Sequence, residues 1–232
     1  ETRIANLCLQ ALNYHEYFVY EKIMRNLVTY YLKHYRKFNS TDSEKEIKTL
    51  SKELNVCKTT ASLLVSRDIK SFKAAKTFFR PSLDHLHDPF LMKDMDKAVK
   101  RIFEAIKNDE KILIYGDYDV DGTTSVALVC KYLKSNSTNQ ISTYIPDRYD
   151  EGYGISYQSI DYAADNEFSL VIALDCGVKA IDKISYANNK KIDYIICDHH
   201  KPETTIPDAA AVLNPLREDC KYPFKYLCGC GI

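Results

Sequence analysis

The chain has 232 residues, enough for one large domain or two small ones, and 45% of them are apolar, an ordinary fraction for a globular protein. Lys plus Arg and Asp plus Glu each number 32, so the formal net charge of zero neither supports nor excludes a nucleic-acid partner. No apolar run approaches the roughly 20 residues needed to cross a bilayer, and no signal peptide is visible, so we expect a cytoplasmic protein without a membrane partner.

The N-terminal part of the chain has the apolar spacing of helices. Residues 1–40 carry apolar side chains at roughly helical intervals and contain no Gly or Pro, so we expect a helical segment of unknown role. Residues 44–108 also predict helices only, the last of them from Asp94 to Lys107. We interpret 44–108 as a helical region that precedes an α/β part, and the polar stretch at 39–43 as a linker.

From Lys111 onward, short apolar strands alternate with helices. The predicted strands span 112–115, 141–145, 170–174, 194–197 and 210–213. The predicted helices between them span 123–133, 157–166 and 180–188. Continuous apolar strands separated by helices indicate a parallel sheet with helices on both faces. The predicted fold class is therefore α/β, with the parallel-sheet domain at 109–232 preceded by an all-helical region.

Acidic and imidazole side chains follow three of these strands at the point where each strand ends. Strand by strand, they are Asp117, Asp119 and Asp121; Asp175; and Asp198, His199 and His200. Ligands of parallel α/β sheets bind beyond the carboxyl ends of the strands. We therefore expect all of these side chains at one edge of the sheet.

A divalent metal site explains this gathering better than local structure does. A single Asp after a strand is more often a helix cap or a turn residue. Five carboxylates at one edge repel one another, however, and need a counter-charge. Oxygen ligands joined by one or two imidazoles suit Mn²⁺ or Mg²⁺ better than a structural zinc.

The same residues resemble the motifs of a known family. The stretch from Tyr115 to Ser125 looks like the first motif of RecJ-type single-strand exonucleases, and Asp175-Cys176-Gly177-Val178 looks like the second. Asp198-His199-His200 is the triplet that names the DHH phosphoesterase superfamily. The flanking segments that are similar as well lie at 78–92, 151–154 and 211–232. The resemblance therefore covers the chain from about residue 46 to its end, and implies a DHH-type catalytic domain truncated at its C-terminal end.

The resemblance implies a hydrolase that uses two ions of Mn²⁺ or Mg²⁺. Asp121 and Asp175 would bridge the two ions, while Asp119 would bind one of them and His199 the other. Such a pair of ions, about 3.5–4 Å apart, activates a water and stabilises the leaving oxygen. The expected metal-binding residues are Asp117, Asp119, Asp121, Asp175, Asp198 and His199.

Other residues are expected to act on the substrate. His200 would contact a substrate phosphate or orient the site, and Asp117 would join the ligands or support them. Arg148 and Lys201 are candidate phosphate contacts, although single exposed cations are more often solvated surface charge. The expected catalytic residues are Asp119, Asp121, Asp175, His199 and His200.

The leading hypothesis is a 5′-to-3′ single-stranded DNA exonuclease of DNA repair and recombination, with single-stranded nucleic acid as partner and DNA favoured. One alternative is a small-substrate phosphodiesterase or pyrophosphatase acting on oligonucleotides or cyclic dinucleotides. The similar segments at 78–92 and 151–154 argue against it. Another alternative is a catalytically inactive scaffold relative, against which the complete set of acidic and imidazole residues argues.

The chain also departs from the family pattern. Many members have His where this chain has Tyr115, so a ligand of the second ion is missing or replaced by water here. The chain begins at Glu1 rather than Met, and the family's fourth-motif Asp, second catalytic-side domain and OB-fold are expected beyond Ile232. We therefore expect a fragment of a longer enzyme that hydrolyses little by itself.

The chain contains eight cysteines that the proposed site does not use. None forms a CxxC pair and several lie in apolar runs, which predicts buried free thiols in a reducing compartment. A zinc site at Cys228-Gly229-Cys230 with Cys220 is the weaker alternative, because one CxC without a second close pair is a poor zinc pattern.

Overall fold

The computed structural model describes residues 41–232, so the helical segment predicted at 1–40 lies outside the described residues. The chain divides into two compact units at the junction between Leu86 and His87. The described part of the first unit is helical, as predicted, and the second unit holds the sheet.

The first unit is built from three α-helices around a small apolar core. They are α3 (Thr41–Leu54), α4 (Lys58–Val65) and α5 (Phe72–Phe79), followed by the short 3₁₀ helix η1 (Leu83–His85). Leu50 of α3 and Leu64 of α4 both belong to this core and are buried. The Ser71 hydroxyl accepts the backbone N–H of Ala74 and so begins α5, because the first N–H groups of a helix have no partner within it.

The second unit contains a five-stranded sheet whose strands all run parallel, which confirms the predicted α/β fold class. The strands are β1 (Ile112–Gly116), β2 (Ile141–Tyr144), β3 (Leu170–Leu174), β4 (Asp193–Cys197) and β5 (Ala211–Leu213). Their order in the sheet is β2-β1-β3-β4-β5. The strands β1 and β3 are buried at every residue, because helices cover both of their faces.

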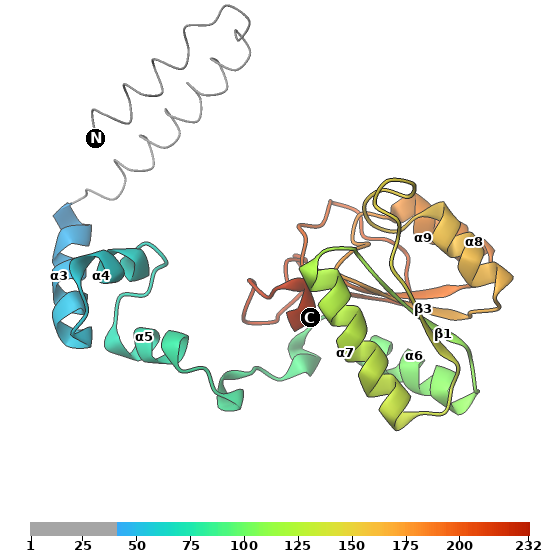
Figure 1. Ribbon diagram of the computed structural model, residues 1–232, viewed down its shortest axis with the longest axis horizontal. Coiled ribbons are helices and arrows are strands. Elements are labelled where there is room, and N and C mark those ends of the chain that lie inside the picture. The colour runs from blue at the N-terminus through green and yellow to red at the C-terminus, as the bar shows by residue number, and fades with distance from the viewer. Residues whose placement is uncertain (1–40) are drawn as a thin grey trace, which may run out of the picture. The chain divides into compact units, whose positions relative to one another are not determined.

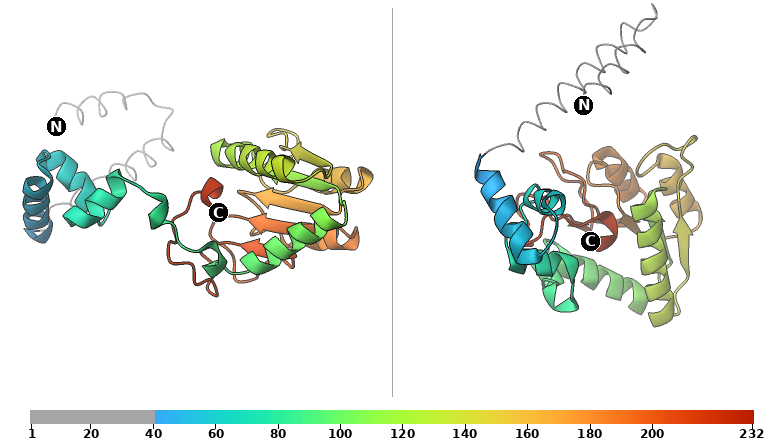
Figure 2. Two further views of the ribbon diagram at one scale, coloured as in Figure 1. Left: turned by 90° about the horizontal axis from the view of Figure 1, so that it is seen from below. Right: turned by 60° about the vertical axis from the view of Figure 1, so that its left-hand side comes forward.

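Helices on the two faces of the sheet bury alternate residues of each strand (Figures 1 and 2). On one face, Ile112 and Ile114 of β1 share a core with α6 (Met95–Lys107) and α7 (Val120–Asn136). On the other, Leu113 and Tyr115 share a core with α8 (Tyr157–Asp165) and α9 (Ile181–Asn189). Two 3₁₀ turns complete the unit, η2 (Pro89–Leu91) and η3 (Gly229–Gly231).

The strand order changes direction between β1 and β3. The chain leaves β1 toward β2 on one side, then crosses back and leaves β3 toward β4 on the other side. In an order of this kind the loops that follow the first and third strands diverge, and ligands bind where they part. The segment after β1 carries Asp117, Asp119 and Asp121, and the segment after β3 carries Asp175. The topology therefore places these carboxylates in two neighbouring loops at one edge of the sheet.

Seven cysteines lie in the described part of the chain, and all are free thiols. Cys176 and Cys220 are buried, as predicted. Cys57 and Cys228 are exposed, so the prediction of buried thiols is wrong for these two, which lie at a helix N-cap and in a loop rather than in an apolar strand. No helix within residues 41–232 is long and apolar enough to cross a membrane.

Candidate metal centre

The turn between β1 and α7 presents two carboxylates in contrasting environments. The side chain of Asp119 caps α7, because its Oδ1 accepts the N–H of Gly122 at 3.0 Å, and this bond lowers the pKa of Asp119. Asp117 is fully buried, and neither of its oxygens has a hydrogen-bond partner of ordinary geometry. Burial raises the pKa of Asp117, and a weak contact with the N–H of Tyr118 lowers it by less.

A glycine allows this turn to be so tight. A Cβ atom at Gly122 would lie 2.3 Å from the backbone oxygen of Asp117 and 2.6 Å from its nitrogen. Any side chain at Gly122 would therefore push α7 away from the end of β1 and move both Asp117 and Asp119.

Asp175 follows β3 in a strained backbone conformation. Its φ of 62° lies in the left-handed region, which a non-glycine residue adopts at some cost, often at functional sites. Its side chain is 1% exposed, and burial together with the nearby charge of Asp119 raises the pKa of Asp175 to about 7. A lowered pKa on Asp119 beside a raised one on Asp175 is the pattern of two carboxyl groups that compete for one proton.

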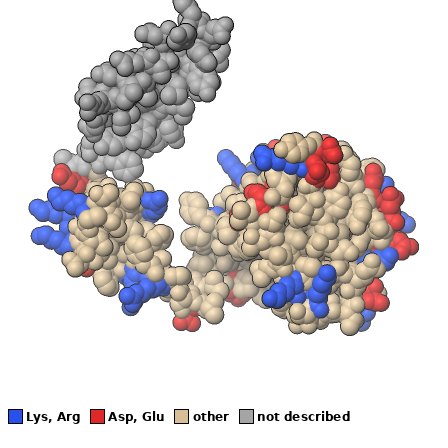
Figure 3. All heavy atoms as spheres, in the orientation of Figure 1, with Lys and Arg blue, Asp and Glu red and all other residues tan. Residues whose placement is uncertain are grey.

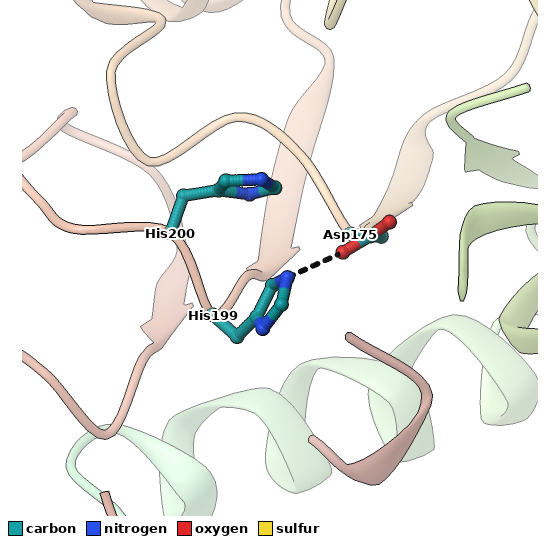
Figure 4. Close-up of side chains that lie close together, drawn as sticks. All are labelled: Asp175, His199 and His200. Atoms are coloured by element: carbon teal, nitrogen blue, oxygen red, sulfur yellow. Dashed lines mark ion pairs between the residues drawn. The ribbon is translucent and has the colours of Figure 1, made fainter. Parts of the chain in front are cut away.

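His199, after β4, directs a ring nitrogen at Asp175 (Figure 4). Its Nδ1 lies 3.0 Å from the carbonyl oxygen of Leu227, which can only accept, so Nδ1 carries the hydrogen. In the neutral form of this ring, Nε2 carries a lone pair, and this atom lies 3.3 Å from Oδ1 of Asp175. Two electron-rich atoms at this distance need a cation or a proton between them. A histidine that binds a metal usually donates its other ring N–H to a backbone carbonyl or a carboxylate, as His199 does to Leu227.

His200 and Asp198 form a second pair beside the first. Oδ1 of Asp198 accepts from the backbone N–H of His200 at 2.9 Å and lies 2.7 Å from Nδ1 of its ring. The other oxygen of Asp198 accepts the N–H of Val178 at 2.9 Å. Both oxygens of this buried carboxylate are thus engaged by protein donors, an arrangement that orients His200. The hydroxyl of Tyr153 lies 3.1 Å from Nε2 of His200, on the far side of the ring.

The last part of the chain closes the centre. The backbone N–H of Gly229 donates to Oδ2 of Asp121 at 2.9 Å. A Cβ atom at Gly229 would lie 2.1 Å from Oδ1 of Asp175, so only glycine allows the backbone to approach this carboxylate. With the bond from His199 to Leu227, the segment 227–229 touches residues that follow three different strands.

The donor set fits a divalent cation. Ligand atoms of Asp175, His199 and His200 lie within 4.8 Å of one another. Oδ1 of Asp175 and both oxygens of Asp117 are buried without a hydrogen-bond donor, which is costly unless a cation or a proton compensates. Within residues 41–232, no lysine or arginine forms an ion pair with any acidic residue of this edge. The described group holds one carboxylate, two imidazoles and no cysteine, a set that can bind Mn²⁺ as well as other divalent ions.

Of the predicted site residues, Asp175, His199 and His200 lie within ligand distance of one another, and the predicted metal ligands Asp117, Asp119, Asp121 and Asp198 are not in that group. The two predicted cations differ in their surroundings. The guanidinium of Arg148 lies 5.3 Å from the ring centroid of Tyr118, in the β1–α7 turn, which ties this exposed residue to the site. Lys201 follows His200 and is exposed, with no ion pair or side-chain hydrogen bond in the described part of the chain. Its predicted phosphate contact stays a prediction.

Three residues that contact the site were not predicted from the sequence: Tyr153, Leu227 and Gly229. Leu227 and Gly229 act through backbone groups, which the residue type does not reveal. All three lie in segments that resemble the family, and this was the only signal. Tyr115 turns away from the centre, since its hydroxyl donates to the carbonyl oxygen of Gly154 at 2.6 Å and its ring is buried beside Tyr144. It anchors the loop that carries Tyr153.

The parallel sheet and the acidic edge agree with a match to a protein family. The family described as "DHH family, N-terminal domain" matches residues 111–232, just over half of the chain. The chain belongs to the DHH family.

Among curated proteins, the chain is similar to enzymes named single-stranded-DNA-specific exonuclease RecJ. It is 40% identical to the one from Bacillus subtilis (strain 168) over 187 residues, which cover 81% of this chain and 24% of that protein. It is 34% identical to the one from Escherichia coli (strain K12) over 138 residues, which cover 60% and 24%. The chain thus spans about a quarter of the length of these relatives.

Two solved structures share the fold. A crystal structure of exonuclease RecJ bound to manganese matches with a TM-score of 0.56 and 26% identity, covering 63% of this chain and 37% of that one. RecJ from Thermus thermophilus in complex with Mn²⁺ matches with a TM-score of 0.58 and 22% identity, covering 81% and 25%. The second likeness concerns the fold alone.

Proposed function

We propose that this chain belongs to a nuclease that uses two divalent ions, Mn²⁺ or Mg²⁺, to remove nucleotides from single-stranded DNA in the 5′-to-3′ direction, in DNA repair and recombination. The observation that carries the proposal is the bare Nε2 of His199 facing a buried, undonated oxygen of Asp175 at 3.3 Å. The RecJ relatives and their manganese complexes support the substrate and the metal.

The residues that would hold the ions are Asp119, Asp121, Asp175 and His199, with Asp117 as an additional or supporting ligand. Bound ions would activate a water and stabilise the leaving oxygen of a phosphodiester. Asp198 would orient His200 rather than bind an ion, because both of its oxygens already accept protein hydrogen bonds.

His200 would meet the substrate. Asp198 holds Nδ1 of its ring, and Tyr153 holds Nε2 from the other side, so the imidazole has a fixed direction before substrate arrives. Such a ring, with a hydrogen at Nδ1 that Asp198 stabilises, can take up a proton at Nε2 and then donate it to a phosphate oxygen. Arg148, beside Tyr118, is placed to contact a further phosphate.

In this proposal, residues 109–232 form the DHH catalytic domain and residues 44–108 precede it. Helix α6, although it lies before residue 109, packs on the sheet and belongs to the same core. The role of residues 1–40 is left open by the proposal.

The test is release of nucleotides from single-stranded DNA labelled at its 5′ end, measured with the whole protein at millimolar Mn²⁺. Asp175→Asn should abolish release and metal uptake, while the matched change Asp165→Asn, on the exposed end of α8, should leave both unchanged. Mononucleotides should appear first from the labelled end.

Three results would overturn the proposal in different ways. Absence of both hydrolysis and metal uptake would favour a scaffold protein. Hydrolysis of dinucleotides or cyclic dinucleotides, without action on long strands, would favour a small-substrate phosphodiesterase. Release that starts from the unlabelled 3′ end would overturn the proposed direction alone.

A further inference from the structure

A cavity of about 210 Å³ adjoins the metal centre on the side of His200. Asp198 and His200 line it together with the residues that lead into α9. The cavity is smaller than the roughly 300 Å³ or more typical of sites for drug-sized molecules, so it suits a phosphate with its sugar. The cavity shares His200 with the metal centre, so a nucleic-acid strand bound at the centre would lie next to the cavity.

Two lysines, Lys179 and Lys183, line this cavity. Neither forms an ion pair or a side-chain hydrogen bond with any residue between 41 and 232. The other charged group in the wall, the carboxylate of Asp198, already accepts hydrogen bonds from Val178 and His200. The cavity therefore carries two lysine charges that form no described ion pair, at the exposed Lys179 and the half-buried Lys183.

The start of α9 adds to this positive field. Its N-cap is Ala180, which has no side chain that can accept the free N–H groups of the first turn. The exposed Asp182 in that turn offsets part of the effect.

The face of the 87–232 unit that is seen in Figure 3 gives no equivalent path for a polyanion. There, the lysines and arginines of the 87–232 unit are scattered among acidic side chains rather than joined into a stripe. A strand near the acidic centre thus needs a local cationic contact, and the lysine cavity supplies one.

We infer that the cavity binds a phosphate of the substrate strand next to the bond that is cleaved, with Lys179 and Lys183 as its ligands. The ring of Tyr153, which also lines the cavity and stands edge-on to His200, would contact the sugar or base of the same nucleotide. This inference rests on the proposed function and names a phosphate subsite of the same centre.

The test is the binding of a fluorescent single-stranded oligonucleotide to the whole protein in EDTA, measured by anisotropy at several salt concentrations. The double variant Lys179→Ala/Lys183→Ala should bind about tenfold more weakly, as expected for lost charge-assisted hydrogen bonds. The slope of log affinity against log salt should fall by about 0.7, the value for one phosphate contact on a single strand.

The matched control is Lys131→Ala/Lys134→Ala, which removes the same charge from exposed positions in the last part of α7. Lys179→Arg/Lys183→Arg should keep the wild-type slope, because the charges are retained. A thermal melt of each variant excludes unfolding as the cause of weaker binding.

An unchanged slope in Lys179→Ala/Lys183→Ala, in a protein that still releases nucleotides with Mn²⁺, would overturn the phosphate subsite and leave the nuclease proposal standing. Equal losses in the α7 control would also overturn it, since the effect would then come from net charge alone. If the wild type releases no nucleotides but the slope still depends on the two lysines, the nuclease proposal fails and the phosphate site stands.

Discussion

The two ends of the sheet use acidic residues in opposite ways. At the amino ends of the strands, Glu110 and Asp193 both bind the guanidinium of Arg101, at 2.7 and 2.6 Å. The hydroxyl of Ser169 donates to Glu110 as well. At the carboxyl ends, Asp117 and Asp175 have no such partner among the described lysines and arginines, and their pKa values are raised.

This contrast distinguishes carboxylates that stabilise the fold through ion pairs from carboxylates that are available to bind a ligand. An arginine lowers the pKa of the acidic residue with which it pairs, as Arg101 does for Glu110. This pair also helps to join α6 to the sheet. An acidic residue that is buried without a donor destabilises the metal-free fold and is retained where a ligand compensates. Mutations at the two ends should therefore have opposite consequences.

The largest expected effect is that of Asp175→Asn on catalysis. The amide has the same shape but no charge, so nucleotide release with Mn²⁺ should fall by about 10³-fold or more, since bound metal supplies several kcal/mol to the transition state. The melting temperature in EDTA should stay equal to that of the wild type or rise, because a buried uncompensated charge is removed. A clear drop in the melting temperature would show that Asp175 is structural and break the contrast.

At the other end, Arg101→Ala should destabilise the fold and leave the chemistry intact. Its loss would leave the partly buried Glu110 with Ser169 as its remaining side-chain donor and the exposed Asp193 without its ion pair, at a cost of about 1–2 kcal/mol. Urea unfolding measures this cost, and the neighbouring change Lys100→Ala on the exposed face of α6 should cost less than about 0.5 kcal/mol. A large loss of activity per folded Arg101→Ala molecule would contradict the division between the two ends.

Metal binding should weaken as the pH falls. The pKa of Asp175 is raised to about 7 in the metal-free protein, so below that pH a metal ion must displace a proton. The apparent affinity for Mn²⁺ should then fall by about tenfold for each pH unit below 7, with proton release visible by calorimetry in two buffers. An affinity that stays constant between pH 8 and pH 6 would show that the carboxylate is already ionised.

The same shift determines the stability of the metal-free protein. Because the folded-state pKa of Asp175 lies above the ordinary value of 3.8, its protonated form favours the folded state. That contribution is fully present below about pH 4 and is lost as the pH rises through 7. Added Mn²⁺ should therefore raise the melting temperature more at pH 8 than at pH 6.

The smallest expected effect is that of Tyr153→Phe. The change removes the hydroxyl that lies 3.1 Å from Nε2 of His200, and loss of such a supporting bond typically costs about tenfold in activity. The loss should appear in kcat, because the hydroxyl holds the His200 ring in one orientation. Tyr149→Phe, at a side chain that is 92% exposed, is the control and should change neither.

The sequence predicted the sheet well because its signals are local. The apolar runs that define β3 and the core of β4 need no knowledge of the rest of the chain, and the strand at 170–174 was predicted with its observed bounds. The helix predicted at 123–133 in fact runs over Val120–Asn136, because the cap at Asp119 lets the acidic turn itself begin the helix.

The sequence predicts which residues form the site, but it does not predict which hydrogen bonds they make. The strand ends placed the acidic and imidazole residues at one edge, as the topology now shows. The partners of Asp198 and Asp121 depend on backbone groups of Val178 and Gly229, and no side-chain pattern reports where a backbone N–H will point. The strand order that makes these loops neighbours is likewise a property of the whole fold.

The bond between Gly229 and Asp121 joins residues 108 positions apart in the sequence. On the ribosome, β1 and its acidic turn emerge long before the segment that completes their surroundings. At about 5–20 residues per second, a growing chain spends several seconds or more with these carboxylates formed but unsupported. The surroundings of the acidic turn therefore cannot be complete until Gly229 has left the exit tunnel.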